Sequence, residues 1–217
     1  MLLRKPLPAE PERALILGAG AFGSRAAREI GRELPGCSVH IADLRTDIAP
    51  DLPGEHHPVT EAMDLMLDLL REDRPDDLVI PCVPVHVAFN WVLTHLGFCI
   101  PVPVALMEQL PGAVAGKDGC IYSSLSDFVC PADCREPEDE CPVSGESRRY
   151  PLFDTIASLS PPSYTNLTVR SEQLLPGVGA ISAGVLFDLL NRARSRRGRF
   201  LIATASRCHG VIHGFTH

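Results

Sequence analysis

Two groups of residues in this chain have the types and spacing to do chemistry, and the first is a run of glycines. Residues 14–23 read Ala-Leu-Ile-Leu-Gly-Ala-Gly-Ala-Phe-Gly, an apolar stretch that enters a Gly-x-Gly-x-x-Gly pattern. Where a strand turns into a helix, Gly18 permits the tight turn, Gly20 lets a pyrophosphate approach the backbone, and Gly23 lets the helix pack on its strand. The helix N-terminus then faces the phosphates. The pattern therefore predicts a dinucleotide site.

The second group is a cysteine-rich loop over residues 130–142, with C-x3-C-x6-C spacing and three stiffening prolines. Closely spaced thiolates can occupy three corners of a tetrahedral zinc site or bind three irons of a cluster, because the short loop costs little closure entropy. Two of the cysteines precede proline, which slightly favours iron–sulfur over zinc; unliganded or redox-active thiols are the alternative. The expected ligands are Cys130, Cys134, Cys141 and Cys208, with His209 and Cys120 as alternatives for the fourth position.

The glycine pattern is informative only inside a βαβ unit, and the sequence predicts one. Apolar residues repeat at helical spacing over residues 22–34, a Pro-Gly break follows, and a second apolar stretch ends in Asp43. Asp43 lies twenty residues beyond Gly23, where a carboxylate accepts ribose hydroxyls and repels a 2′-phosphate. NAD is therefore favoured over NADP, although Arg45 could attract a 2′-phosphate. A turn that binds no nucleotide, or another adenosine compound, is the alternative.

Residues 14 to about 105 resemble the Rossmann NAD(P)-binding superfamily, which includes dehydrogenases and the NAD-binding regulatory domains of potassium-uptake systems. The resemblance implies a ribose contact at Asp43 and a cofactor crevice bordered by Val83 and Pro84, where an apolar strand ends. No specific family is recognised for residues 111–217. The diphosphate contacts that the resemblance implies are Gly18, Ala19, Gly20, Ala21, Phe22 and Gly23.

Composition and charge restrict the class of protein. The 217 residues are 45% hydrophobic and 22% charged with a net charge of −7, which indicates a globular protein without general affinity for nucleic acid. The most apolar window, residues 78–106, contains prolines and histidines, so no membrane span is expected. The first residues lack the apolar core of a secretory signal, which predicts a cytoplasmic protein. A small-molecule substrate or a protein redox partner is expected, and a homodimer is compatible with such a fold.

The expected fold class is α/β. Residues 1–110 are predicted to form a Rossmann-like, doubly wound parallel sheet that binds NAD, and residues 111–217 a smaller α+β module that carries the cysteine loop. Thr60 is expected to cap a helix that runs to about Arg71.

The leading hypothesis is an NAD-binding oxidoreductase or redox protein with a cysteine-ligated metal centre near the cofactor. No Ser-Tyr-Lys, Cys-His or paired-acid constellation is legible, so catalytic residues are unassigned, and His86, His209 and Lys117 are only candidates. The main alternative is a non-catalytic protein that senses NAD or NADH and contains a structural zinc site. A third hypothesis is a dehydrogenase-like fold that acts on a tetrapyrrole or a metal ion.

Overall fold

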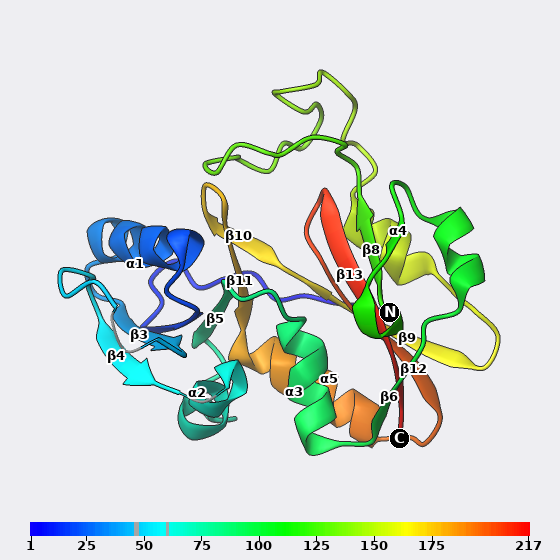
Figure 1. The fold of residues 1–217 in the computed structure, drawn as a ribbon, viewed down its shortest axis with the longest axis horizontal. Coiled ribbons are helices and arrows are strands. Elements are labelled where there is room, and N and C mark those ends of the chain that lie inside the picture. Colours follow the sequence, from blue (N-terminus) through cyan, green and yellow to red (C-terminus); the bar gives the residue numbers. More distant parts are fainter. Residues whose placement is uncertain (46–47, 60) are drawn as a thin grey trace.

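The computed structural model describes residues 1–45, 48–59 and 61–217, which form a mixed α/β fold with two mixed sheets (Figure 1). The expected α/β class is thereby confirmed. The first sheet has the strand order β10-β11-β5-β2-β3-β4. The second has the order β1-β9-β12-β13-β8-β7, with β6 paired to β13.

The first sheet is built around β2, whose residues Ala14, Leu15, Ile16 and Leu17 are all fully buried. A continuous apolar run of this kind is typical of a strand that is covered on both faces. Strands β2, β3, β4 and β5 pair in parallel, whereas β11 and β10 join β5 in antiparallel order. The bounds are β2 (Arg13–Leu17), β3 (Ser38–Asp43), β4 (Glu55–Pro58), β5 (Leu78–Pro81), β10 (Glu172–Leu175) and β11 (Val178–Ser182).

The purely parallel, doubly wound sheet expected from the sequence is therefore replaced by a mixed one. After β5 the chain does not return to this sheet through another crossover. Instead, the free edge of β5 pairs with β11. Strand β10, which precedes β11 in the chain, forms a hairpin with it and becomes the edge strand. Antiparallel strands need only a tight turn between them, so a distant segment can complete the sheet in this way.

The second sheet is centred on β12, which pairs in parallel with β9 and antiparallel with β13. The N-terminal strand β1 adds to the outer side of β9. The bounds are β1 (Leu2–Leu3), β6 (Phe98–Ile100), β7 (Val114–Ala115), β8 (Ile121–Ser124), β9 (Tyr164–Arg170), β12 (Arg199–Ala205) and β13 (His209–Thr216).

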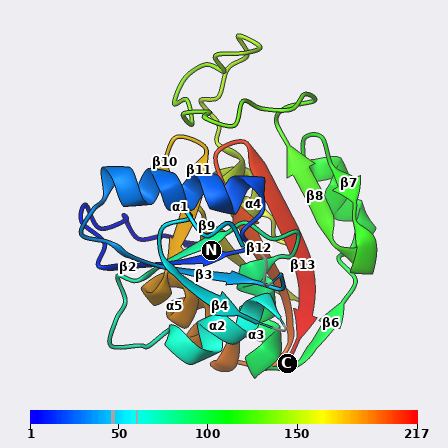
Figure 2. The same cartoon turned by 60° about the vertical axis from the view of Figure 1, so that its left-hand side comes forward.

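The helices form layers around and between the sheets. Helix α1 packs on the outer face of the first sheet and α4 on the outer face of the second, while α2, α3 and α5 fill the space between them (Figures 1 and 2). Thr60 lies outside the described residues; Glu61 is the N-cap of α2, in a reciprocal capping box with Asp64. The bounds are α1 (Ala21–Glu33), α2 (Ala62–Leu69), α3 (Val87–His95), α4 (Leu152–Ser158), α5 (Ala183–Arg194) and the 3-10 turns η1 (Val104–Gln109) and η2 (Lys117–Gly119).

The two sheets draw strands from both sides of residue 110. Strand β6 precedes that residue but joins the second sheet, whereas β10 and β11 follow it but join the first. The division into domains of residues 1–110 and 111–217 remains a prediction. Within the described part of the chain, none of the helices has the length and apolar character needed to cross a membrane.

Candidate functional site

The three glycines of the turn between β2 and α1 differ in whether the fold itself requires a residue without a Cβ. Gly18 has a φ of +95°, and a Cβ there would lie 2.8 Å from the carbonyl oxygen of Cys82. A Cβ on Gly23 would lie 1.8 Å from the carbonyl oxygen of Gly18. A Cβ on Gly20 would meet no atom within 4 Å. The turn itself therefore requires Gly18 and Gly23, whereas Gly20 leaves accessible backbone, as close approach of a ligand would need.

The N-terminus of α1 is open to an anion. Its N-cap, Gly20, has no side chain to cap the helix, and the first turn contains no acidic residue. Phe22 in that turn is exposed. Backbone N–H groups in the first turn of a helix lack intrahelical partners and carry partial positive charge, so phosphate is a favourable ligand here.

Asp43, at the end of β3, lies against this turn. Its carboxylate accepts hydrogen bonds from the backbone N–H of Ala19 at 2.5 Å and of Arg45 at 2.8 Å, and from Arg45 Nε at 3.2 Å. Burial by itself would raise the pKa of Asp43, but these hydrogen bonds and the Arg45 charge hold the pKa below its ordinary value. Asp43 is thus an ionised acceptor at the position predicted for ribose recognition.

Two cavities lie on either side of the Val83-Pro84 segment that follows β5. The Asp43 cavity, of about 530 Å³, is lined by Gly18, Asp43, Val83 and Pro84 together with apolar side chains from the start of α2. The Phe22 cavity, of about 400 Å³, shares Val83 and Pro84 and extends to Phe22 and the β10–β11 hairpin. Of the predicted cofactor residues, five line these two cavities at the carboxyl ends of β2, β3 and β5: Gly18, Phe22, Asp43, Val83 and Pro84. The lining does not include Ala19, Gly20, Ala21 or Gly23.

A third cavity, the cysteine cavity of about 420 Å³, shares Phe22, Gly177 and Gly179 with the Phe22 cavity. It lies beneath the loop that rises above the β10–β11 hairpin in Figures 1 and 2. The structure therefore brings the predicted metal ligands together beside the glycine turn. The ligand candidates that line the cavity are Cys130, Cys134, Cys141, Cys208 and His209.

The cysteine loop is held on the β10–β11 hairpin by backbone contacts. Gln173 donates from Nε2 to the carbonyl oxygen of Cys134 at 2.7 Å and accepts from the N–H of Glu136 at 3.1 Å. The N–H of Gly177 also donates to the Cys134 carbonyl at 2.9 Å. A Cβ on Gly177 would lie 1.8 Å from the carbonyl oxygen of Ala132, so this glycine permits the close approach. These contacts fix the loop against the hairpin of the first sheet.

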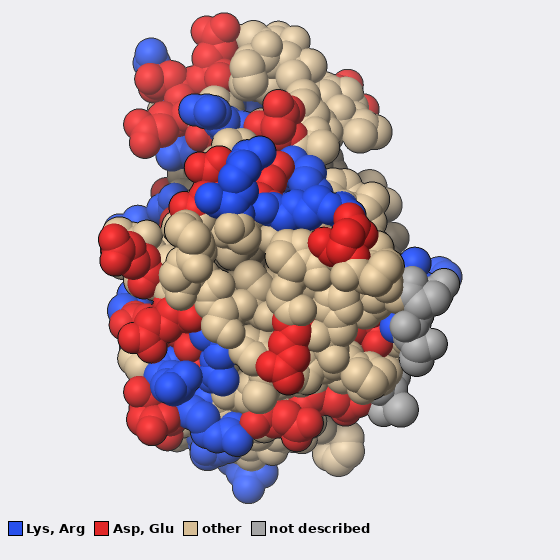
Figure 3. Space-filling view, turned by 90° about the vertical axis from the view of Figure 1, so that its left-hand side faces the viewer, with Lys and Arg blue, Asp and Glu red and all other residues tan. Residues whose placement is uncertain are grey.

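The charges around the loop differ from those on α1. In Figure 3 the loop stands above the body of the molecule with acidic side chains on its surface, and Lys and Arg side chains gather at the level of α1 below it. Arg25 of α1 donates to the carbonyl oxygen of Gly177 at 3.1 Å. Helix α1, the hairpin and the cysteine loop are consequently one connected unit.

The thiol environments differ within the cavity. Burial raises the pKa of Cys134, and negative charge on Cys130 and Cys141 raises it further. Hydrogen bonds from the backbone N–H groups of Ser144 and Val143 lower the pKa of Cys141. Such N–H donors stabilise a thiolate, the form that ligates metals.

Basic groups also contact the cysteines. Nε2 of His209 lies 3.5 Å from Sγ of Cys130. Burial raises the pKa of Cys208, and the Arg148 guanidinium opposes that effect. The cavity thus combines four sulfur atoms with nearby basic groups. These basic groups can offset part of the negative charge that the thiols acquire when they ionise.

The separation of the sulfur atoms bears on which metal centres the cavity could hold. In tetrahedral zinc sites, Zn–S bonds near 2.3 Å put sulfur atoms about 3.8 Å apart. In the described part of the chain, the ligand atoms of at least three His, Cys, Asp or Glu residues lie within 4.8 Å of one another at one place only. That place is not the cysteine cavity. The cysteines are therefore more widely spaced than a preformed zinc cage. A cluster distributes its ligands over several irons and accommodates wider spacing.

The other candidates lie outside these cavities. Cys120 is buried, and its Sγ donates to the carbonyl oxygen of Lys117 at 3.2 Å, while Lys117 itself is exposed on η2. His86 is 8% exposed and is held by Thr204 Oγ1 at 2.8 Å and by His213 Nδ1 at 2.9 Å. Of the proposed catalytic groups, His209 is the one placed at a cavity.

The His86–His213 pair predicts a dependence of stability on pH. Burial lowers the pKa of both rings, and for His86 the second ring lowers it further. The unfolded state therefore binds more protons below about pH 6.5, and stability falls as the pH drops toward the native pKa values. We expect urea unfolding between pH 7 and 5 to lose up to about 1.4 kcal/mol per pH unit for each histidine. His213→Asn should reduce this slope; an equal slope in this variant and the original protein would contradict the assignment.

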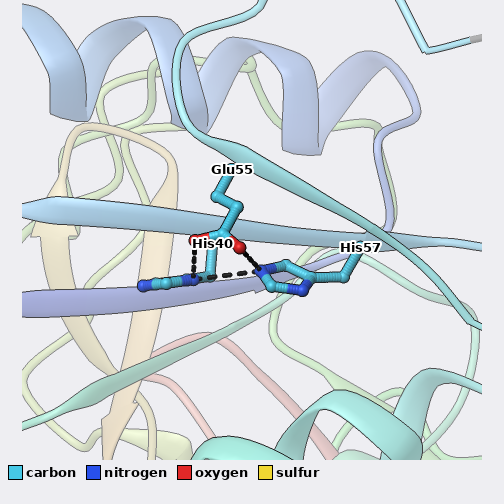
Figure 4. Close-up of side chains that lie close together, drawn as sticks. All are labelled: His40, Glu55 and His57. Carbon is cyan, nitrogen blue, oxygen red and sulfur yellow. Dashed lines mark hydrogen bonds and ion pairs between the residues drawn. The ribbon is translucent and has the colours of Figure 1, made fainter.

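One further cluster is not apparent from the sequence. His40 on β3 and Glu55 and His57 on β4 converge on the face of the sheet away from α1 (Figure 4). The available signal was the alternation in β4, because residues two apart in a strand share a face. The partner strand was not recognisable, since Glu-His-His-Pro lacks the apolar character of a predicted strand.

Residues 88–217 match the model of the family AF_1314_C, whose description is "Uncharacterized protein, C-terminal domain". The chain belongs to the AF_1314_C family. A curated protein of Archaeoglobus fulgidus, described as "Uncharacterized protein", is 29% identical over 216 residues, which cover 91% of this chain and 96% of that protein. No solved structure matches the chain.

This match corrects the resemblance drawn from residues 14 to about 105. The matched AF_1314_C family is not a Rossmann NAD(P)-binding family, so the predicted membership of that superfamily is wrong. The physical reason lies in the motif: Gly18 and Gly23 are demanded by the packing of the turn itself. A strand that turns tightly into a helix needs them whatever its ancestry. The AF_1314_C segment includes the whole cysteine loop and lies after the glycine turn.

Proposed function

We propose that this protein binds NAD at the glycine turn and holds an iron–sulfur cluster in the cysteine cavity, as a redox protein or oxidoreductase. One observation carries the proposal. The Asp43 cavity, the Phe22 cavity and the cysteine cavity adjoin in that order, each sharing lining residues with the next. Two redox-capable sites from distant segments of the chain are therefore neighbours.

The nucleotide part of the proposal rests on three features of the turn. Gly20 exposes backbone that no internal packing requires, and α1 presents free N–H groups beside it. Asp43 supplies an ionised acceptor at the distance along the motif that suits a ribose. The Asp43 cavity of about 530 Å³ has apolar walls for an adenine, including Val59 and Met63. These features favour NAD over a 2′-phosphorylated cofactor.

The cluster part rests on the donor set. Four cysteines line one cavity, and Cys141 accepts backbone hydrogen bonds that stabilise its thiolate. In the described part of the chain, no three of their ligand atoms lie within 4.8 Å of one another, so a single zinc ion would require the thiols to move closer together. The Cys-Pro pairs at residues 130–131 and 141–142 favour iron–sulfur slightly over zinc. When bound, the nicotinamide supplies hydride chemistry and a cluster supplies single-electron transfer. The chain orients the two groups through Phe22 and the β10–β11 hairpin, which border both cavities.

The test is metal analysis and an ultraviolet-visible spectrum of protein purified without air. We expect iron, sulfide and a brown absorbance that falls when NADH and a catalytic amount of an electron mediator are added. Cys134→Ser should lose most of the iron and absorbance, whereas Cys99→Ser should retain both, because exposed Cys99 lies outside the cysteine cavity. Colourless protein without iron after cluster reconstitution would remove the proposal.

A second candidate function is favoured by the buried position of His86. That ring is held by Thr204 and His213, and within the described part of the chain the ionisable side chains that line the Asp43 cavity are those of Asp43, Arg45 and Glu61. This arrangement suits a non-catalytic sensor of NAD or NADH with a structural zinc site. Stoichiometric zinc without colour, together with a partner affinity that NADH changes, would favour the sensor over the redox protein.

A further inference from the structure

We propose that His40, Glu55 and His57 form a binding site for a divalent transition metal of the Zn²⁺ type, separate from the cysteine cavity. The three side chains come from neighbouring parallel strands, in which His40 pairs with Glu55 and Ala42 with His57. Their ligand atoms all lie within 4.8 Å of one another. Figure 4 shows the two imidazole rings and the carboxylate pointing toward one another.

The distances fit a metal ion of this size. Zn–N and Zn–O bonds near 2.0–2.1 Å with tetrahedral angles put ligand atoms about 3.3 Å apart. Nδ1 of His40 lies 3.0 Å from Nε2 of His57, and Glu55 carboxylate oxygens lie 3.5 Å and 3.7 Å from these two nitrogens. The three separations are on both sides of the ideal value, so binding needs shifts of a few tenths of an ångström.

The surroundings of His40 can accommodate the tautomer that metal binding requires. Its other ring nitrogen, Nε2, lies 3.2 Å from Ser38 Oγ, which can accept an N–H hydrogen bond. A proton on Nε2 leaves the Nδ1 lone pair free for a metal, the arrangement usual for histidine ligands.

The donor set selects the class of metal. Imidazole nitrogens suit Zn²⁺ and its first-row neighbours, whereas Mg²⁺ and Ca²⁺ prefer sets made of oxygen atoms. With three protein ligands, the fourth position of a tetrahedral ion is left for water or another small ligand. A metal here would link the edge strand β4 to β3. Asp43 and Val59, which follow the ligand residues in these two strands, line the Asp43 cavity.

The test is titration of the chelator-treated 217-residue protein with Co²⁺, whose visible d–d bands report imidazole and carboxylate ligation. Cobalt–thiolate charge-transfer bands report the cysteine cavity separately. We expect saturable d–d absorption without those bands, displacement by Zn²⁺, and no displacement by Mg²⁺. His57→Ala and Glu55→Gln should weaken this component at least tenfold. His56→Ala is the matched control, because its ring faces the other way and contacts the carbonyl oxygen of Leu52 at 3.2 Å.

Folding of each variant is checked by circular dichroism, and Glu55→Gln changes a side chain that is 67% exposed and therefore leaves the core intact. Unchanged Co²⁺ affinity in Glu55→Gln and His57→Ala would overturn the proposal, as would equal loss in His56→Ala. The site is independent of the cysteine cavity, so Cys134→Ser should retain it.

Discussion

Replacing Gly23 by alanine is expected to lower the free energy of unfolding by about 3 kcal/mol or more. The new Cβ would lie 1.8 Å from the carbonyl oxygen of Gly18 and 3.3 Å from the Ile16 side chain. Backbone cannot yield as a flexible side chain can, so α1 must move away from β2 and lose packing of Ala26, Ala27 and Ile30. Urea unfolding followed by circular dichroism measures the loss.

Gly36→Ala is the control for that experiment. Gly36 follows the same helix, its φ is not in the left-handed region, and a Cβ there meets no atom within 4 Å. Its unfolding free energy should stay within about 1 kcal/mol of the original. A Gly23→Ala protein as stable as Gly36→Ala would show that the turn has more room than the structure gives it.

Replacing Gly20 by alanine is expected to weaken NADH binding about 100-fold and to leave stability nearly unchanged. The fold has space for the Cβ, and the φ of −66° suits any residue. A bound diphosphate would occupy that same space, so the methyl group would push it from the N–H groups of α1. A 100-fold loss corresponds to about 2.8 kcal/mol.

Fluorescence titration of NADH against the original protein, Gly20→Ala and Gly36→Ala measures this effect. Equal affinity in all three proteins would contradict a diphosphate at the turn. Because Gly20→Ala keeps the fold, lost binding reports the site, whereas the same loss in Gly23→Ala would report only the damaged turn.

Much of the local structure of the first sheet could be predicted from the sequence. The apolar run before Gly18, the helical spacing after it and the break at residues 35–36 correspond to β2, α1 and the start of β3. These elements depend on neighbours in the chain, so periodicity and turn residues are sufficient to locate them. The positions of the four predicted ligands on one cavity could also be anticipated, because three of them share a loop.

Other features depend on contacts between distant segments. Residues 176–179 contain a proline and two glycines, which locally indicate only a turn, yet the hairpin they connect completes the first sheet and holds the cysteine loop. The local sequence of residues 172–182 does not indicate that β11 pairs with β5. The His40–Glu55–His57 cluster was missed for the same reason, since it requires the register between β3 and a short polar strand.

The wrong prediction of family membership has a similar origin. A glycine pattern reflects the steric requirements of a single turn, and here the close backbone contacts at Gly18 and Gly23 explain those two glycines. Family membership is a property of many positions together. In this chain those positions extend from residue 88 to residue 217.

The late position of β10 and β11 has a consequence for how the protein is made. Residues 13–81 supply four strands of the first sheet early in synthesis, but the exposed side of β5 acquires its partner only once Ser182 has left the ribosome. Chains emerge at roughly 5–20 residues per second, so that edge waits at least several seconds. During this interval the nascent chain presents an unpaired strand, and the cysteine loop is synthesised before the hairpin on which it rests.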